Sequence, residues 1–414
     1  MSAAGEVRAA AARLRAAGVA LAALPRGERI AALGALLERL RDPTSAIRSR
    51  LASELPAATG FHATTLAAGL DAGFAPWTAR AFADLVETEL GTNSPRIASG
   101  FPLTAVVLGG AIPMPSVLQM LAPLALGSTV LVRPGAHDLV TAPAIASALG
   151  EIAPALGRSV EVVSFPHGDG EAMAALAEAE CVVATGSDAA VAAVRALTRP
   201  WQRFVGYGHR FSVAAIERGA DLPAACAAVA RDTALWDQAG CLSPVALYAV
   251  GWRWADRAEL LSELERAFAQ RALQWPLAKL EGAHTAARAH EIATSEMRGA
   301  GASSADVRRD PANQWALLAE RESEFRGSPL GRVLRVHFVP SFEAMVEALR
   351  PVARHLASIG LAGRAALGAP PPLLALRPSR ICRLGEMQAP PISWCHDGQG
   401  VLVPLAALTS TRDA

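Results

Sequence analysis

The side chains with the most chemical potential in this sequence are its cysteines, Cys181, Cys226, Cys241, Cys382 and Cys395. Their odd number, the absence of CxxC pairs and the lack of HExxH spacing give no indication of a metal site, so no metal is expected. Cys181 and Cys226 lie in apolar patterns typical of packing residues. Cys241 differs, because Asp237-Gln-Ala-Gly-Cys-Leu-Ser-Pro244 predicts a polar elbow between a helix and an apolar strand. An accessible thiolate is a nucleophile, but spacing alone leaves nucleophile and packing residue as equal interpretations.

A second segment of interest is Thr185-Gly186-Ser187, which follows an apolar run and opens a helical stretch at Asp188–Ala196. Backbone N–H groups and the dipole at a helix N-terminus bind phosphate. Ordinary helix capping is the alternative interpretation, because Ser and Thr cap helices routinely. A standard Rossmann turn is disfavoured, since Gly168-Asp-Gly170 and Gly206-Tyr-Gly208 do not continue as GxGxxG.

These segments must be positioned by regular elements, and short apolar runs alternate with Ala-rich helical stretches from Phe101 onward. The expected strands are Leu103–Leu108, Thr129–Val132, Val160–Phe165 and Cys181–Ala184, with helices around Val117–Leu126, Ala142–Leu149 and Glu171–Ala179. This alternation predicts a parallel sheet with crossover helices and a nucleotide site at the carboxyl ends of the strands.

The flanking regions have their own patterns. The first hundred residues are expected to be helical, because Ile30, Leu33, Leu37 and Leu40 line one helix face. Beyond Asp221 the expected elements are a helix at Leu222–Trp236, a strand at Pro244–Val250, a helix near Arg257–Ala272, a flexible loop at Gly299–Asp310 and a strand at Val333–Val339.

Composition narrows the class of protein. The 414 residues are enough for two or three domains, and 39 basic against 38 acidic residues give no nucleic-acid-binding face. Ile97–Val132 is uncharged, but its prolines and glycines divide it into pieces too short to span a membrane. The N-terminal segment has charges and no apolar region of a signal peptide, so a cytoplasmic protein with reduced thiols is expected.

The Asp-Gln-x-x-Cys-Leu-Ser-Pro motif resembles the nucleophile motif of the LuxC family of acyl-CoA reductases, which belong to the aldehyde dehydrogenase superfamily. Further segments resemble the family in the expected order: Gly206–Ser212, Trp315-Ala-Leu-Leu, Ser328–Arg332, Ile359–Ala362, Arg380–Gln388, Pro390–Trp394 and His396–Gly398. The resemblance runs from about Phe101 to near the C-terminus. It implies an α/β, aldehyde dehydrogenase-like fold with a parallel-sheet cofactor domain, an α/β catalytic domain and a helical N-terminal region.

The resemblance also implies roles for individual residues. Cys241 is the expected acyl-accepting nucleophile, and Gln238 of the same motif and His209 are the other candidate catalytic residues. For His209 a plain loop residue is the favoured alternative. The expected cofactor-binding residues are Arg133, Thr185, Gly186, Ser187, Glu324 and Phe325. Arg133 stands where the superfamily usually has a lysine near the adenosine ribose, and its guanidinium can pair with a phosphate at two points, which favours NADPH.

Two departures from the superfamily pattern concern the fate of the acyl group. Aldehyde-oxidising members carry a glutamate that activates water, whereas the corresponding Phe204–Arg210 has no carboxylate. Without a positioned base, water attack is slower by roughly 10²–10⁴-fold, so a thioester can await hydride. Ala111–Pro115 also lacks the asparagine that serves as an oxyanion donor, which makes the backbone N–H of Cys241 the expected replacement.

The resulting expectation is NADPH-dependent reduction of a long-chain acyl-CoA or acyl-protein thioester to the aldehyde. The alternatives are a CoA-acylating aldehyde dehydrogenase acting oxidatively, and an acyl-carrying subunit of an acyltransferase or ligase complex without turnover. The expected organisation is a helical region at 1–100, a cofactor domain at 101–220, a catalytic domain at 221–354 and a segment at 355–414 that returns to the cofactor domain. The expected partners are an acyl-CoA or acyl-carrier substrate, an acyltransferase or acyl-protein synthetase, and further copies of the chain in a homo-oligomer.

Overall fold

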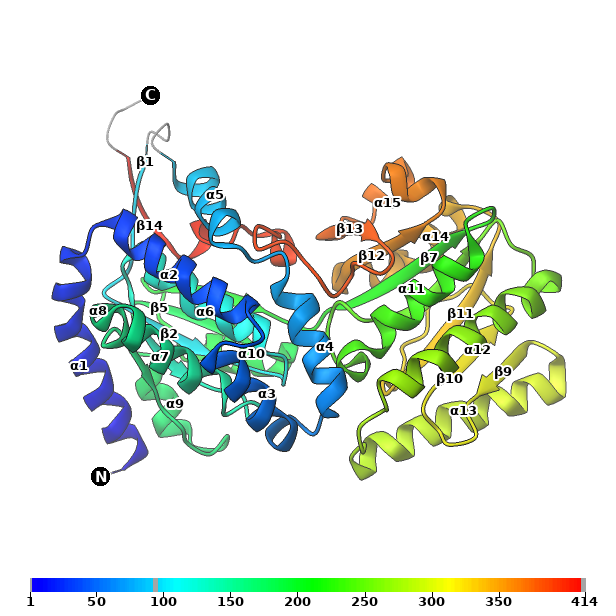
Figure 1. The fold of residues 1–414 in the computed structure, drawn as a ribbon, viewed down its shortest axis with the longest axis horizontal. Coiled ribbons are helices and arrows are strands. Elements are labelled where there is room, and N and C mark those ends of the chain that lie inside the picture. The colour runs from blue at the N-terminus through cyan, green and yellow to red at the C-terminus, as the bar shows by residue number, and fades with distance from the viewer. Residues whose placement is uncertain (1, 92–95, 411–414) are drawn as a thin grey trace. The chain divides into compact units, whose positions relative to one another are not determined.

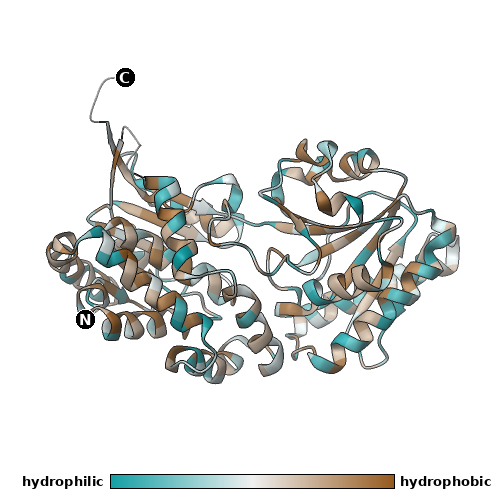
Figure 2. Cartoon of the chain, turned by 45° about the horizontal axis from the view of Figure 1, so that its top comes forward, coloured by the Kyte–Doolittle hydropathy of each residue, from teal (hydrophilic) through white to brown (hydrophobic). Residues whose placement is uncertain are grey.

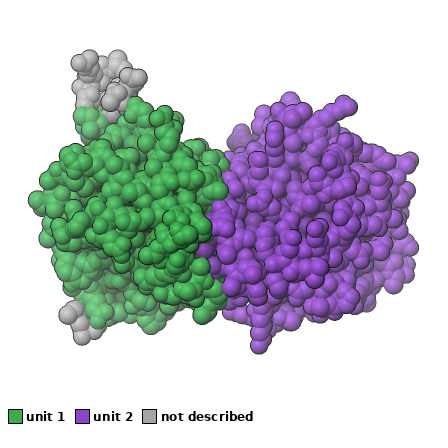
Figure 3. Space-filling view, in the orientation of Figure 1, with its two compact units in different colours: residues 1–59, 73–209, 391–414 green, residues 60–72, 210–390 purple. Residues whose placement is uncertain are grey.

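The chain divides into two compact units, shown in different colours in Figure 3. The computed structural model describes residues 2–91 and 96–410. Unit 1 is built from residues 1–59, 73–209 and 391–414, and unit 2 from residues 60–72 and 210–390. Cys241 therefore belongs to unit 2, whereas Arg133 and the Thr185–Ser187 segment belong to unit 1.

Unit 1 contains a five-stranded parallel sheet in the order β4-β3-β2-β5-β6. Its strands are β2 (Leu103–Val107), β3 (Thr129–Arg133), β4 (Val160–Val162), β5 (Cys181–Thr185) and β6 (Arg203–Tyr207). The helices that connect them are α6 (Pro113–Leu126), α7 (Thr141–Ile152), α8 (Pro154–Gly157), α9 (Gly170–Leu176) and α10 (Asp188–Ala196). The parallel sheet expected from the alternating sequence is confirmed.

The N-terminal helices are α1 (Ala3–Ala23), α2 (Arg26–Arg41), α3 (Ala46–Thr59), α4 (Ala63–Phe74) and α5 (Ala79–Leu90). Helix α1 packs with α9 over one face of the sheet, where Val7 and Leu14 meet Leu131 of β3 and Leu176 of α9 (Figure 1). This contact buries apolar side chains on one stripe of α1, which is how an amphipathic helix is held against a sheet.

The uncharged stretch at Ile97–Val132 folds as short elements of this layered core. It runs through β1 (Arg96–Ser99), β2, α6 and β3, and β1 pairs with β14 (Ala407–Ser410) in a separate antiparallel ribbon. Among the described residues, no helix has the length and apolar character needed to cross a membrane.

Unit 2 contains a seven-stranded sheet in the order β13-β12-β7-β8-β11-β10-β9. Its strands are β7 (Phe211–Glu217), β8 (Pro244–Val250), β9 (Ala305–Arg309), β10 (Ala316–Glu320), β11 (Val333–Val339), β12 (Leu356–Ala362) and β13 (Arg380–Arg383). All neighbours are parallel except β9, which runs antiparallel to β10. The strands expected at Pro244–Val250 and Val333–Val339 are confirmed with the same bounds.

Helices cover both faces of this sheet. They are α11 (Leu222–Ala234), α12 (Arg257–Gln274), α13 (Gly282–Ala302), α14 (Phe342–Leu349) and α15 (Pro371–Leu374), with short 3₁₀ turns η1 (Leu235–Gln238), η2 (Trp254–Asp256), η3 (Arg350–His355) and η4 (Arg364–Leu367). Unit 1 has two more such turns, η5 (His396–Gly398) and η6 (Val403–Leu405). Figure 2 shows helices that carry hydrophobic residues on one side and hydrophilic residues on the other, as this layering requires.

The flexible loop expected at Gly299–Asp310 is wrong. Helix α13 continues to Ala302, and β9 occupies Ala305–Arg309 at the edge of the sheet. Edge strands tolerate charged side chains, since one side of the strand faces no neighbour. The polar composition of Asp306, Arg308 and Arg309 therefore hid a strand that is paired on one side only.

A row of polar side chains crosses three adjacent strands of unit 2. Tyr248 lies opposite His337, and His337 lies opposite Glu320. His337 is fully buried, and its Nδ1 donates a hydrogen bond of 2.9 Å to the carbonyl of Glu322. Burial lowers the pKa of His337 to about 4, so its 4.0 Å contact with Glu320 is not an ion pair at neutral pH.

The burial of His337 predicts that unit 2 is sensitive to acid. The pKa of His337 is lower in the folded chain than its ordinary value of 6.5. The contribution of the neutral ring to the free energy of unfolding is therefore complete above pH 6.5 and is lost as the pH falls toward 4. The loss reaches about 3 kcal/mol at most. Urea unfolding of the wild type and of His337→Gln at pH 7, 6 and 5 should show a steeper decline in the wild type, and parallel declines would contradict it.

Candidate active site

Cys241 lies on a loop with unusual backbone geometry between α11 and β8. Trp236, Asp237 and Gln238 have φ values of 57°, 48° and 68°, so three consecutive residues other than glycine are left-handed. Each such residue costs roughly 1–2 kcal/mol relative to the right-handed conformation. The surrounding structure must therefore hold this loop, and strain of this kind is concentrated at functional sites.

Packing holds the first of these residues. The Trp236 ring is 2% exposed and lies 5.7 Å from the Phe61 ring in an edge-to-face contact. Its indole also lies directly against Gly69 of α4, where a Cβ would approach to 2.5 Å. Glycine is thus required at position 69 for the indole to occupy this place.

A buried ion pair holds Asp237, the second left-handed residue. Nη2 of Arg332 donates to Oδ1 of Asp237 at 2.5 Å, with the two side chains 1% and 5% exposed. Burial raises the pKa of Asp237 and lowers that of Arg332, although each partner opposes the shift of the other. Both groups have thus lost water, and the removal of either charge leaves the other buried without a counterion.

The side chain of Gln238 holds the end of the left-handed run. Its Nε2 donates to the carbonyls of Pro244 and Val333, both at 2.9 Å, and its Oε1 accepts the N–H of Val333 at 2.9 Å. Both amide hydrogens are therefore used within the protein. The side chain of Gln238, which was expected to be catalytic, therefore bonds to the backbone near Cys241.

The loop that supplies these partners has the same geometry. Leu330, Gly331 and Arg332 have φ values of 66°, 63° and 61°, directly before β11. The two left-handed turns are thus joined by the Asp237–Arg332 pair and by the two bonds between Gln238 and Val333, which directly follows Arg332. We call this arrangement the paired turns.

Cys241 itself stands in a tight turn beyond the paired turns. The N–H of Ser243 donates to the carbonyl of Gly240 at 2.9 Å, and Oγ of Ser212 donates to the carbonyl of Cys241 at 2.7 Å. Ser212 and Ser243 are both fully buried, whereas Cys241 is half-buried. The thiol therefore sits on a fixed backbone at the edge of the buried core.

The other cysteines are less suited to nucleophilic chemistry. Burial raises the pKa of Cys181 and of Cys226 to about 12, and it also raises the pKa of Cys382. These thiols are protonated at neutral pH and are weak nucleophiles. Cys395 is exposed, but it lies in unit 1 and outside the motif that surrounds Cys241.

The predicted cofactor residues of unit 1 gather at the carboxyl end of its sheet. Arg133 ends β3 and is 8% exposed, and its guanidinium lies 5.2 Å above the ring of Phe165. It forms no hydrogen bond or ion pair with any residue that the structure describes, and burial lowers its pKa. A buried cation without an anionic partner is a place for an anionic ligand.

Thr185 lies at the point where the strand order reverses, between β2 and β5. Oγ1 of Thr185 accepts the N–H of Gly109 at 2.9 Å, and a Cβ on Gly109 would approach the Thr185 carbonyl to 2.6 Å. Gly186 has a φ of 151°, and the hydroxyl of Ser187 caps α10 through the N–H of Ala190. In open α/β sheets, nucleotides bind at this reversal point.

The remaining candidates are placed as follows. His209 is exposed, and its backbone N–H donates to Oδ1 of Asp188 at 2.7 Å, beside Ser187. Glu324 is exposed on the loop between β10 and β11. Phe325 stacks on Phe211 with centroids 4.5 Å apart, next to the Ser212 that holds Cys241. Within unit 2, Gln238 thus lies on the Cys241 loop and Phe325 packs against β7. Unit 1 contains Arg133, Thr185, Gly186, Ser187 and His209.

Sequence reasoning gave no role to Ser212, Arg332 and Gln388, which surround the Cys241 loop. Each lies within a segment that resembles the acyl-CoA reductases, so the resemblance marked their positions without indicating what they do. Their roles depend on partners that are 29, 95 and 145 residues away in the sequence.

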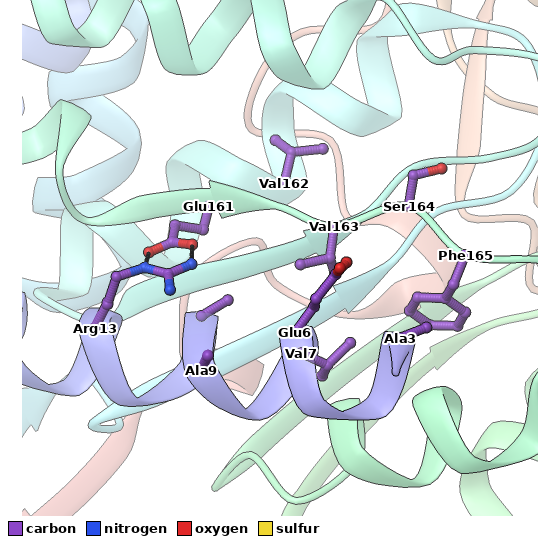
Figure 4. A pocket seen from close by; sticks show the side chains of 11 residues that line it. Ala3, Glu6, Val7, Ala9, Arg13, Glu161, Val162, Val163, Ser164 and Phe165 are labelled. Carbon is purple, nitrogen blue, oxygen red and sulfur yellow. Dashed lines mark hydrogen bonds and ion pairs between the residues drawn. The ribbon is translucent and has the colours of Figure 1, made fainter. Parts of the chain in front are cut away.

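A hollow of about 300 Å³ in unit 1 lies elsewhere, between α1 and residues 161–165. Figure 4 shows Arg13 and Glu161 joined across one end of it, with Glu6, Val163 and Phe165 further along. The candidate residues do not line it, although Phe165 also carries the guanidinium of Arg133 on its ring. Among the described residues, no cluster of three or more potential ligands could hold a metal.

The two units have the architecture of the aldehyde dehydrogenases. An NAD-dependent benzaldehyde dehydrogenase from Corynebacterium glutamicum superposes with a TM-score of 0.77 at 15% identity, covering 99% of this chain and 88% of its own. An indole-3-acetaldehyde dehydrogenase from P. syringae gives 0.76 at 15% identity with the same coverage. These similarities define the fold as aldehyde dehydrogenase-like.

Sequence comparison identifies the family within this class. The profile of the acyl-CoA reductase (LuxC) family matches residues 49–409, and the chain belongs to this family. A long-chain acyl-protein thioester reductase of Aliivibrio fischeri is 24% identical over 245 residues, which is 58% of this chain and 49% of that protein. The protein of the same name from Vibrio harveyi is 24% identical over 280 residues, which is 64% of this chain and 57% of that protein.

The paired turns generate a stability prediction. Arg332→Gln leaves the Asp237 carboxylate buried without a cation and should lower the free energy of unfolding by about 3–5 kcal/mol. Asp237→Asn, which tolerates left-handed φ, should also destabilise the protein. The double variant should lose less than the sum of the two, as chemical denaturation of all four proteins will measure. Additive losses would show that the charges do not interact.

Proposed function

We propose that this protein reduces a fatty acyl thioester to the aldehyde through a covalent thioester on Cys241. The observation that carries the proposal is the fixed, strained loop that presents Cys241, within a family of acyl-CoA reductases. The relatives named as long-chain acyl-protein thioester reductases support the substrate class. Residues 204–210 contain no carboxylate that could activate water against the acyl group, so the acyl-enzyme is expected to persist until hydride or a thiol reacts with it.

Cys241 does the covalent work in this scheme. Its thiolate attacks the acyl carbonyl, the new C–S bond forms, and the C–S bond to the carrier breaks, so that the carrier thiol leaves with a proton. After hydride is added to the carbonyl carbon, the hemithioacetal alkoxide on Cys241 re-forms its C=O bond and the C–S bond to Cys241 breaks, which releases the aldehyde and regenerates the thiolate. The bonds from Ser212 and Gln238 keep the backbone fixed through both steps.

The residues of unit 1 fit a nicotinamide cofactor. The buried guanidinium of Arg133 suits a phosphate, and the glycines at the reversal point allow close approach of a ligand to the backbone. The bound dihydronicotinamide supplies the hydride, and the protein supplies binding and orientation. Among nicotinamide cofactors, Arg133 favours NADPH, because the 2′-phosphate offers the anion that this cation lacks within the protein.

The donor of the acyl group is an acyl-protein or acyl-CoA thioester. An acyl-protein donor implies a protein partner that carries or transfers the acyl group, such as an acyltransferase or acyl-protein synthetase. Tests with each thioester separate these donors.

The first experiment tests Cys241 as the acyl carrier. After exposure to acyl-CoA without cofactor, the intact mass of the wild type should rise by one acyl group, and peptide mapping should place it on Cys241. Cys241→Ser should fold normally yet lose both the adduct and NADPH oxidation, because its hydroxyl is barely ionised at neutral pH. The adduct should persist and not appear as free fatty acid.

Cys395→Ser is the matched control, because it removes an exposed thiol outside the motif. It should keep the adduct and the activity. An adduct on Cys395, or full labelling of Cys241→Ser, would overturn the mechanism.

The second experiment concerns the cofactor. The wild type should show a higher kcat/KM with NADPH than with NADH, and Arg133→Ala should lower the value for NADPH by about 10–100-fold, as expected for one lost charge-assisted contact. Arg133→Lys keeps the charge without the paired N–H groups, so its kcat/KM with NADPH should lie between those of the wild type and Arg133→Ala. Equal kcat/KM for both cofactors in the wild type would remove the proposed preference.

A further inference from the structure

The turn that follows β13 contacts both ends of the Cys241 loop. Nε2 of Gln388 donates to the backbone carbonyl of Asp232 at 3.0 Å and to Oγ of Ser243 at 3.1 Å. Asp232 lies in the last turns of α11, and Ser243 directly precedes β8. One amide group therefore ties together the two points between which the loop runs.

A second bond strengthens the contact at α11. The N–H of Gly385 donates to Oδ2 of Asp232 at 2.6 Å, and the carboxyl is fully buried. Gly385 has a φ of 90°, which a residue with a side chain rarely adopts. The chain can therefore turn back toward α11 at this position.

The turn is itself rigid. The guanidinium of Arg380 donates to the carbonyls of Glu386, Met387 and Ala389 at 2.9–3.3 Å. Met387 is fully buried against β12, where a Cβ on Gly360 would lie 2.5 Å from its sulfur. The backbone on both sides of Gln388 is thus fixed, and the Gln388 side chain is only 6% exposed.

We propose that Gln388 is a positioning residue for Cys241, because its amide fixes the two ends of the loop that presents the thiol. The 3.1 Å bond to Ser243 is the more direct, since the N–H of Ser243 closes the tight turn from Gly240 that contains Cys241. Loss of the amide lets this turn move relative to the Ser212 hydroxyl that holds its other side. A shift of about 1 Å at a reacting group costs on the order of 100-fold in rate.

The test uses Gln388→Leu, which keeps the size of the side chain and removes the amide, and it has two readouts. The first is the rate constant for alkylation of Cys241 by iodoacetamide under native conditions, followed by peptide mapping, which should fall by about tenfold. The second is steady-state reduction, in which kcat should fall by about 10–100-fold while KM for the acyl thioester stays within about twofold, since the buried amide of Gln388 bonds to Asp232 and Ser243 within the protein.

Two further variants separate positioning from general destabilisation. Ser243→Ala removes only the acceptor beside Cys241, and it should also slow alkylation, but by less than Gln388→Leu does. Phe268→Leu loosens the core of the same unit at a buried position on α12, and it should lower the thermal midpoint without slowing alkylation. If Phe268→Leu slows alkylation as much as Gln388→Leu at an equal loss of stability, or if Gln388→Leu and Ser243→Ala leave alkylation unchanged, Gln388 is not a positioning residue.

The second readout rests on the proposed reaction, whereas alkylation needs neither acyl substrate nor cofactor. If the wild type has no reductase activity and Gln388→Leu still slows the alkylation of Cys241, the positioning role of Gln388 is kept and the proposed reaction is rejected. If the wild type is an active reductase and Gln388→Leu changes neither alkylation nor kcat, the proposed reaction is kept and the positioning role is rejected.

Discussion

Unit 2 depends on a backbone conformation that its own sequence does not favour. Two turns, at Trp236–Gln238 and Leu330–Arg332, are left-handed over three residues each, and five of the six are not glycine. Neither turn is stable without partners, because the cost of each residue in this conformation is of the order of 1–2 kcal/mol. They hold each other through the buried Asp237–Arg332 pair and the bonds between the Gln238 amide and Val333, so neither turn can relax without breaking bonds to the other.

The need to hold these two turns explains why buried polar side chains around Cys241 bond to the backbone. Ser212, Gln238 and Gln388 are almost fully buried, and each directs its hydrogen bonds to the main chain or to a serine of the loop. Buried polar groups of this kind are stable only when satisfied, and they then define one arrangement. The half-buried thiol is the side chain that this scaffold leaves at its edge.

The sequence predicted the regular elements well, because apolar periodicity follows from burial. Pro244–Val250 and Val333–Val339 are apolar through most of their length, and both are strands with these bounds. The edge strand at Ala305–Arg309 was missed, since it is polar and paired on one side. The left-handed turn at Trp236–Gln238 has no glycine or asparagine to signal it, and the partners of Asp237 and Ser243 are 95 and 145 residues distant. Such pairings arise only from the tertiary fold.

The distance along the chain between the Cys241 loop and its supports has a consequence for biosynthesis. A ribosome has made the thiol long before it makes Arg332 and Gln388, and contacts between distant residues form late because loop closure is slow. The loop is therefore unsupported while the residues between Cys241 and Gln388 are made, and the geometry around Cys241 is completed only when β11 and the turn after β13 have joined the sheet. The last-made part of unit 2 thus decides when the cysteine acquires its final surroundings.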